Sequence, residues 1–391
     1  MSHLDYYIKH DIAPVSYDLS DLEAHFQRRE ALYRTLGALP LTFRGARVLE
    51  VAAGTGHNSL YVASLFPDSY TLLEPNPAGI RAIKDCYAGA GFPHTAPTLI
   101  EAKLEDYVPD NRFDIVLCEN WLGSSAHERG LLRKLAGFVA PRGVLVVTCV
   151  SPIGFMPNII RRALAARLTA GEASFERKTD VLVEAFGPHL RTIAGMTRSA
   201  KDWVQDNMIN PAYFDLCLTL PMLVDELGGE LQIAGVSPDF RRDWRWFKAL
   251  SGKDFEFNSQ VLQEYFRVGA ALLDYRIDPA ESDAQFNRTL EDKALDLVKT
   301  VRRYEDAPDK QGPEHGVLLD RLTDIESTLQ SGFPSASWTA AVAEARGLLA
   351  NTVIAAADVA AMTGFGGWFG RETVYLSLER TAFSVRRERA A

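Results

Sequence analysis

The sequence predicts an α/β fold in which helices cover a doubly wound, mostly parallel sheet. Apolar runs alternate with segments of helical spacing between residues 46 and 150. The first run, residues 46–51, ends beside a tight turn that contains Gly54 and Gly56, and helical spacing begins at residue 58. A strand, a glycine turn and a helix in this order open a βαβ unit.

Four further apolar runs follow in the order that such a sheet requires. We predict strands at residues 70–74, 98–101, 113–118 and 143–150. Residues 126–139 have helical spacing and stop before Pro141 and Gly143, which interrupt a helix. The first 150 residues therefore hold the parallel part of the sheet.

The chain of 391 residues is longer than this core needs. Residues 153–168 and 178–190 have helical spacing, and the polar and aromatic stretch 203–211 is interpreted as a lid over the functional edge of the sheet. A helix ended by glycine at 220–227 and an apolar run at 231–236 then predict a sixth strand.

Helical periodicity continues from about residue 255 to 361, with breaks near Pro308 and Pro334. Residues 373–380 alternate polar and apolar side chains, as an antiparallel strand does, and complete the sheet as a seventh strand. The expected division is an N-terminal cap at 1–40, a core at 41–150, a lid insertion at 151–215, a core continuation at 216–240, a helical domain at 241–365 and a returning C-terminal strand at 366–391.

Two acids beside the glycine turn indicate a site for a nucleoside cofactor. Glu50 lies near the end of the first strand, and Glu74 ends the second. A ribose diol needs a carboxylate acceptor at the latter position. We therefore predict that Glu74 binds a ribose.

The run Glu50-Val51-Ala52-Ala53-Gly54-Thr55-Gly56 resembles the first motif of class I S-adenosylmethionine-dependent methyltransferases, which usually reads acid-x-Gly-x-Gly-x-Gly. Ala52 replaces the first glycine, and its methyl group takes up room next to the cofactor. The resemblance covers about the first 150 residues and, more faintly, the last twenty. It implies a Rossmann-like methyltransferase sheet with a helical lid insertion and a large helical block before the C-terminal antiparallel strand.

The resemblance also implies a set of cofactor contacts. An acceptor for the adenine amine is expected in the turn of Leu104, Glu105 and Asp106, although a solvated turn explains the two acids equally well. His57 follows the glycine turn and either shapes the cofactor pocket or packs in the core. The full set of residues expected to contact S-adenosylmethionine is Glu50, Ala52, Gly54, Gly56, His57, Asn58, Glu74, Leu104, Glu105, Asp106, Glu119 and Asn120.

Methyl transfer from a sulfonium is an in-line displacement, so the protein mainly has to position the acceptor and, for oxygen or nitrogen, take a proton. Glu119 and Asp206 are the candidate catalytic bases. The expected acceptor is a small molecule, with a sugar or a surface-glycan precursor as the weakly favoured class. The residues expected to line its site are Trp121, Trp203, Asn207 and Tyr213.

Two alternatives remain open at this stage. A scaffold protein could bind S-adenosylmethionine without catalysis and recruit a partner through the helical block. A dinucleotide-dependent oxidoreductase would use Gly54-x-Gly56-x-x-Ser59 as a pyrophosphate fingerprint. Against the oxidoreductase, the third glycine is missing, Glu50 would repel a diphosphate, and no second nucleotide-binding half follows.

Composition limits the class of partner. A net charge of −9 and a pI near 5.5 argue against nucleic acid, and no apolar run is long enough to span a membrane, so we expect neither a nucleic-acid nor a membrane partner. Four cysteines without a CxxC pair predict a reduced, cytoplasmic setting, and eight scattered histidines predict no metal site. The stretch from Arg241 to Trp246 interleaves arginine with tryptophan, which we interpret as partly buried packing residues rather than a binding patch.

Overall fold

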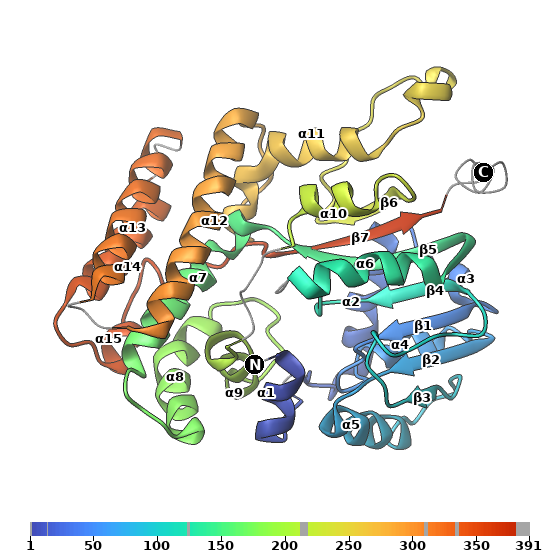
Figure 1. The fold of residues 1–391 in the computed structure, drawn as a ribbon, viewed down its shortest axis with the longest axis horizontal. Coiled ribbons are helices and arrows are strands. Elements are labelled where there is room, and N and C mark those ends of the chain that lie inside the picture. The colour runs from blue at the N-terminus through green and yellow to red at the C-terminus, as the bar shows by residue number, and fades with distance from the viewer. Residues whose placement is uncertain are drawn as a thin grey trace. The chain divides into compact units, whose positions relative to one another are not determined.

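The computed structural model describes residues 2–13, 15–122, 126–211, 218–308, 312–332 and 336–380, which fall into two compact units (Figure 1). The first unit comprises Met1–Val150, Leu216–Tyr265 and Thr373–Ala391. The second comprises Ser151–Asp215 and Phe266–Glu372. Each unit is described separately below.

The first unit is built on a seven-stranded sheet of order β3-β2-β1-β4-β5-β7-β6. Its strands are β1 (Arg47–Val51), β2 (Ser69–Leu73), β3 (Thr98–Ile100), β4 (Phe113–Cys118), β5 (Val139–Val150), β6 (Gln232–Ser237) and β7 (Thr373–Glu379). Strands β1 to β5 are parallel, whereas β7 runs antiparallel to both β5 and β6. The predicted fold class and the returning seventh strand are confirmed.

Helices of the first unit follow or precede these strands. They are α1 (His3–His10), α2 (Leu22–Thr35), α3 (Pro40–Phe43), α4 (Ser59–Ser64), α5 (Pro77–Ala88), α6 (Ala126–Phe138), α10 (Leu220–Leu227) and α11 (Asn258–Val268), whose last residues belong to the second unit. The central strands are apolar on both faces, as buried parallel strands are. Val48, Leu72, Ile115 and Val146 pack together with Tyr33 of α2 in one core.

Strand β5 begins at Val139, earlier than the predicted residue 143. The register between β4 and β5 shifts between Phe113 and Ile115, and this irregularity takes up the extra residues. Gly143 lies at the shift, where a Cβ atom would come within 2.9 Å of the Asp114 carbonyl oxygen. Pro141 and Gly143, which we read as the end of a helix, therefore belong to a bulged strand.

Strand order reverses at β1, because β2 lies on one side of it and β4 on the other. Ligands of open parallel sheets bind outside the carboxyl ends of the strands at such a switch point. The ends of β1, β2 and β4 are therefore where a functional site is expected in this unit.

The second unit is helical. It contains α7 (Pro152–Leu168), α8 (Phe175–Leu190), α9 (Ala200–Val204), α12 (Ala284–Asp306), α13 (Pro313–Gly332), α14 (Ala336–Ala350) and α15 (Ala356–Ala360), with a π-helical turn at Gln205–Ile209 and a 3-10 helix at Gly269–Leu273. Helix α12 packs on α7 and α13, and α14 packs on α13. The break predicted near Pro308 lies between α12 and α13, whereas the break predicted near Pro334 lies outside the described residues.

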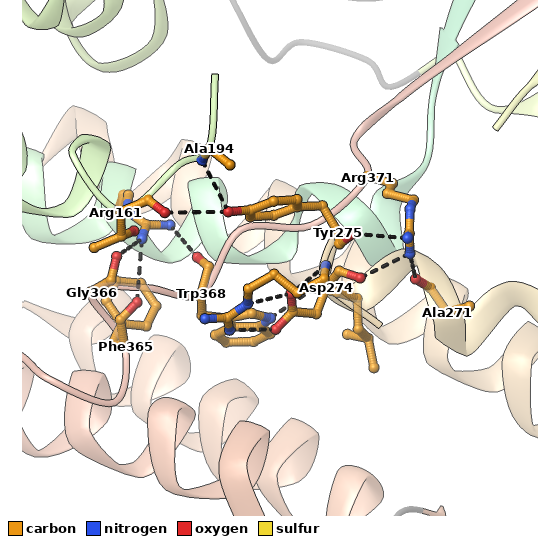
Figure 2. A network of polar contacts seen from close by, with 12 residues as sticks. Arg161, Ala194, Ala271, Asp274, Tyr275, Phe365, Gly366, Trp368 and Arg371 are labelled. Carbon is orange, nitrogen blue, oxygen red and sulfur yellow. Dashed lines mark hydrogen bonds and ion pairs between the residues drawn. The ribbon is translucent and has the colours of Figure 1, made fainter. Parts of the chain in front are cut away.

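Two arginines, of which Arg161 is buried and Arg371 is partly buried, organise the segment that leads into β7 (Figure 2). The Arg161 guanidinium is completely buried and donates to the carbonyl oxygens of Trp368 at 2.9 Å and Gly366 at 3.0 Å. Arg371 donates to the carbonyl oxygens of Ala271 at 2.6 Å and Asp274 at 2.9 Å. The two side chains tie residues 365–371 to α7 and to the segment after α11.

One packing prediction is wrong. Trp244 and Trp246, which we expected to be partly buried, are 94% and 64% exposed. They lie in the first unit between β6 and α11, in a segment whose short 3-10 helices are Phe247–Ala249 and Gly252–Asp254. In the part of the chain that the structure describes, no helix is long and apolar enough to cross a bilayer.

Candidate functional site

The turn after β1 has the left-handed backbone that its glycines predict. Gly54 has φ +60° and Gly56 has φ +76°, values that favour glycine. A Cβ atom on Gly54 would meet nothing within 4 Å, whereas one on Gly56 would lie 3.1 Å from Ile83 of α5. Gly56 thus lets a helix approach, and Gly54 leaves open space at the end of β1.

Ala52 also has a left-handed backbone, with φ +59°. Its N–H group donates to the Leu73 carbonyl oxygen at 2.9 Å, which holds the conformation against the end of β2. An alanine in this region is strained by its Cβ atom. Replacing the usual glycine therefore affects the backbone as well as the space beside it.

Glu74 is the residue that joins the turn to β2. Its side chain is 5% exposed, and its Oε2 atom accepts a hydrogen bond from the Gly54 N–H group at 2.8 Å. The other oxygen, Oε1, accepts from the Asn76 N–H group at 2.9 Å. Burial raises the pKa of Glu74 to about 7, although both hydrogen bonds lower it.

Glu50 lies within β1, one residue before the strand ends. Its carboxylate accepts from the Ser59 hydroxyl at 2.9 Å and from the Tyr70 hydroxyl. Burial raises the pKa of Glu50 to about 7. The structure thus places a second buried carboxyl group with a raised pKa beside the glycine turn.

The segment before α2 runs along the glycine turn. The Thr55 hydroxyl donates to the Val15 carbonyl oxygen at 2.7 Å, and the Tyr17 N–H group donates to Nδ1 of His57 at 2.9 Å. Asn76 donates to the Ile12 carbonyl oxygen at 2.9 Å. His57 therefore helps hold the N-terminal segment against the turn.

Arg29 of α2 reaches the carboxyl end of β4. Its Nη2 atom lies 2.8 Å from each carboxylate oxygen of Glu119, which follows the strand directly. The Tyr33 hydroxyl donates to the same carboxylate at 2.7 Å. Within the described part of the chain, the buried Nε atom of Arg29 has no hydrogen-bond partner.

Asn120 follows Glu119 with a left-handed backbone, φ +55°. Its N–H group donates to the Thr148 hydroxyl at 2.8 Å, and its side-chain amide donates to the Tyr375 hydroxyl at 2.9 Å. Residues from β4, β5 and β7 thus converge beside Glu119. Trp121 comes next and is partly buried.

Acids directly follow three strands of the sheet, since Glu74, Glu101 and Glu119 come after β2, β3 and β4. Sequence reasoning passed over Glu101 because it treated that residue as the end of a strand. It also missed Arg29, whose long-range pairing leaves no local signal. In the turn after Glu101, Leu104 is buried while Glu105 and Asp106 are exposed.

Other candidate residues belong to the second unit. Trp203 lies in α9, just before the π-helical turn that carries Asp206 and Asn207. All three side chains are buried. Asp206 pairs with Arg198 at 2.6 Å, and Asn207 donates to the Trp203 carbonyl oxygen at 3.0 Å. Tyr213 lies outside the described residues. In the first unit, Asn58 directly precedes α4 and is partly buried.

A comparison with protein families matches residues 24–171 to the methyltransferase domain. This range runs from α2 through β5 into α7, and it contains the glycine turn and the acids described above. No curated protein matches the chain.

Solved structures of methyltransferases resemble part of the chain. An S-adenosylmethionine-dependent methyltransferase from Mesorhizobium loti is 21% identical over 33% of this chain, with a TM-score of 0.28. The N-methyltransferase NodS from Bradyrhizobium japonicum WM9 (TM-score 0.29) and the magnesium protoporphyrin IX methyltransferase from Synechocystis PCC 6803 with bound S-adenosylmethionine (TM-score 0.30) are each 16% identical over 37% of it. The chain spans 57% of the length of the first protein and 73% of each of the others.

The residues that match this family include the glycine turn at the end of β1 and the five parallel strands of the sheet. Over residues 24–171, the chain is therefore similar to the methyltransferase domain family.

Proposed function

We propose that this chain transfers the methyl group of S-adenosylmethionine to a small-molecule acceptor by in-line displacement. The observation that carries the proposal is the position of the Glu74 carboxylate, which bonds to Gly54 at 2.8 Å and so connects the ends of β1 and β2. Each oxygen of Glu74 accepts from one N–H group, and a carboxylate oxygen can accept a second hydrogen bond. The ribose hydroxyls of the donor would supply those bonds.

The charged end of the donor fits the other groups at this edge. Its methionine part carries a carboxylate and an ammonium group. Arg29 has a buried guanidinium atom, Nε, that finds no partner in the described residues and would donate to the carboxylate. Glu119 and the Glu50 carboxyl would favour the ammonium and the sulfonium.

For the adenine, we assign the turn after β3. Leu104 is 2% exposed and would supply an apolar contact, while Glu101, Glu105 or Asp106 would accept from the exocyclic amine. Of these, Glu101 follows β3 directly and is therefore the first to test.

The acceptor must lie in line with the sulfonium, and a hydroxyl or amine acceptor must lose a proton. Glu119 and Asp206 are the proposed bases, and each already accepts from an arginine. Glu119 belongs to the same unit as the glycine turn, which makes it the first choice. Trp121, Trp203, Asn207 and Tyr213 are the proposed acceptor contacts, with a sugar or a surface-glycan precursor as the acceptor class.

A cytoplasmic setting is part of the proposal. Cys86, Cys118 and Cys149 form no disulfide in the described residues, which agrees with a reducing compartment.

The test is calorimetric titration of the protein with S-adenosylmethionine. We expect Glu74→Ala to weaken donor binding at least tenfold, which corresponds to about 1.4 kcal/mol. The matched control is Glu30→Ala, which removes a glutamate of α2 whose side chain is 41% exposed in its pair with Arg34, and which should leave affinity unchanged. Unchanged affinity in Glu74→Ala would exclude the ribose role, and tighter binding of a nicotinamide dinucleotide would exclude the cofactor.

A second measurement separates an enzyme from a scaffold that merely binds the donor. Wild type is incubated with radiolabelled S-adenosylmethionine and a panel of metabolites that includes nucleotide-linked sugars. Release of S-adenosylhomocysteine with label in an acceptor supports catalysis. Donor binding without turnover on any acceptor class would favour the scaffold.

A further inference from the structure

The segment between β6 and α11, whose backbone can be followed in Figure 1, carries aromatic side chains that are exposed to solvent. In this aromatic loop, defined as residues 239–255, Trp244 is 94% exposed, Trp246 is 64% exposed and Phe247 is 67% exposed. Every residue from 242 to 249 is exposed. Such a cluster of large apolar side chains is uncommon on a protein surface unless something covers it.

The loop holds this shape through its polar residues. Arg245 pairs with Asp243 at 2.6 Å and donates to the carbonyl oxygens of Asp254 at 3.1 Å and Glu256 at 3.0 Å. Arg241 pairs with Asp239 at 3.0 Å. This is the reverse of the usual pattern, in which charged side chains are exposed and aromatic ones are buried. Here Arg241 and Arg245 are held by aspartates of the loop, while Trp244 and Trp246 are exposed.

The charge of the loop differs from that of the chain. Residues 239–255 contain five basic and three acidic residues, whereas the whole chain has a net charge of −9. The Lys248 ammonium lies 5.6 Å from the Trp246 ring and 5.9 Å from the Phe247 ring. Charges more than about 10 Å away are largely screened at physiological salt, so a local basic site can face an anionic surface.

We propose that the aromatic loop docks the protein reversibly on the surface of an anionic lipid bilayer. Tryptophan and phenylalanine partition into the interfacial region of a bilayer, and a lysine beside them, here Lys248, interacts with anionic headgroups. The association is peripheral, and it departs from the absence of a membrane partner that composition predicts. It also goes beyond the proposed methyl transfer and does not depend on it.

The paired arginines favour a bilayer over nucleic acid. Binding to nucleic acid rests on lysines and arginines that neutralise several phosphates. Here Arg241 and Arg245 are bound to aspartates of the loop itself. Interfacial partitioning rests mainly on the aromatic rings, which are the groups that the loop leaves exposed.

The test measures sedimentation of the full chain with vesicles of phosphatidylcholine alone or mixed with phosphatidylglycerol. We expect wild type to sediment with the anionic vesicles, and its tryptophan emission to shift to the blue as Trp244 and Trp246 enter the interface. The triple variant Trp244→Ala/Trp246→Ala/Phe247→Ala should lose about tenfold or more in partitioning, because three rings no longer leave water. Lys248→Glu should weaken binding to anionic vesicles and leave binding to neutral ones unchanged.

The matched control is Leu41→Ala, which removes a side chain that is 78% exposed elsewhere in the same unit and should sediment like wild type. The shift in tryptophan emission is measured on the wild-type protein. It therefore tests membrane docking even if the triple variant fails to fold. The proposal is overturned if wild type stays in the supernatant, if its emission does not shift, or if the triple variant sediments equally. It is also overturned if the loop variants abolish self-association or oligonucleotide binding instead.

Discussion

The Nη2 atom of Arg29 lies 2.8 Å from both carboxylate oxygens of Glu119. The two side chains are 9% and 11% exposed, so little water reaches the pair. One residue belongs to α2, and the other follows β4. The contact therefore joins the N-terminal region to the carboxyl edge of the sheet, where the donor is proposed to bind.

Removing Arg29 alone should destabilise the first unit. Arg29→Met would leave the Glu119 carboxylate without its cation, a change that typically costs about 3–5 kcal/mol when a buried pair is broken. Arg29→Met/Glu119→Gln should recover much of this loss, because no unpaired charge remains. Urea denaturation followed by circular dichroism measures the difference in free energy of unfolding.

The control for this pair is Arg34→Met, which breaks an exposed ion pair with Glu30 on the same helix. Exposed pairs contribute about 0.2–1 kcal/mol, so this change should be small. If Arg29→Met and Arg34→Met lower the free energy of unfolding equally, the buried pair contributes no more to stability than the exposed one.

Buried carboxyl groups make a pH-dependent contribution to stability. Burial raises the pKa of Glu74 and of Glu372 to about 7, from a usual value of 4.5. Because the folded state then binds protons that the unfolded state releases, stability is fully present below pH 4.5 and is lost as pH rises to about 7. Each group would account for up to about 3 kcal/mol.

Glutamine variants isolate this effect, since glutamine resembles the protonated acid at every pH. Between pH 5 and pH 8, Glu74→Gln and Glu372→Gln should each gain stability relative to wild type. The exposed Glu105→Gln should show no such trend. A flat difference between wild type and Glu74→Gln across this range would contradict the raised pKa of Glu74.

Sequence patterns predicted the elements whose burial is repetitive. The apolar runs of β1, β2 and β4 and the alternation in β7 follow directly from which faces are buried. Glu74 could be proposed from its place after a strand and from the glycine turn. The strand order required the family resemblance, because runs of similar composition do not specify neighbours.

Other features depend on contacts far apart in the chain. Arg29 meets Glu119 across 90 positions, and nothing local to either residue indicates the pair. Trp244 was expected to pack because tryptophan is usually well buried. Its neighbour Arg245 instead donates to the carbonyl oxygens of Asp254 and Glu256, contacts that composition does not reveal.

Ala52 offers a test of strain in the turn. Because its φ is +59°, Ala52→Gly should remove a conformational penalty of about 1–2 kcal/mol, less the greater entropy of glycine in the unfolded chain. We expect a net gain of at most about 1 kcal/mol in the free energy of unfolding. Thermal denaturation of the two proteins measures it.

The neighbouring Ala53 provides the comparison, since it is not among the residues of positive φ. Ala53→Gly should lower stability by about 0.5–1 kcal/mol, because only the entropic term remains. If both substitutions destabilise equally, the backbone at Ala52 is not strained.

Arg161 gives the sharpest prediction for the second unit (Figure 2). Its guanidinium lies 4.7 Å from the Phe365 ring and 3.8 Å from the Phe369 ring, and it donates to carbonyl oxygens of the same segment. Burial lowers the pKa of Arg161 to about 9, which shows how unfavourable the site is for the charge. The hydrogen bonds therefore have to offset a large desolvation cost.

Arg161→Met would remove that cost, but it would leave the Trp368 and Gly366 carbonyl oxygens without their donor. Each buried unsatisfied group costs about 1–3 kcal/mol, so we expect a net loss. Arg161→Lys would keep the charge and lose the fork that reaches both carbonyls, and it should also destabilise the unit. Arg321→Met, at a side chain that is 44% exposed and pairs with the 47% exposed Asp296 in the same unit, should change little.

Two compact units need not unfold together, so a global midpoint would mix their responses. Hydrogen exchange read at residues 365–371 reports on the segment that Arg161 holds. In Arg161→Met, these amides should exchange faster, while amides of β1 and β4 keep their wild-type rates. Faster exchange in both units, or in neither, would show that Arg161 does not anchor this segment specifically.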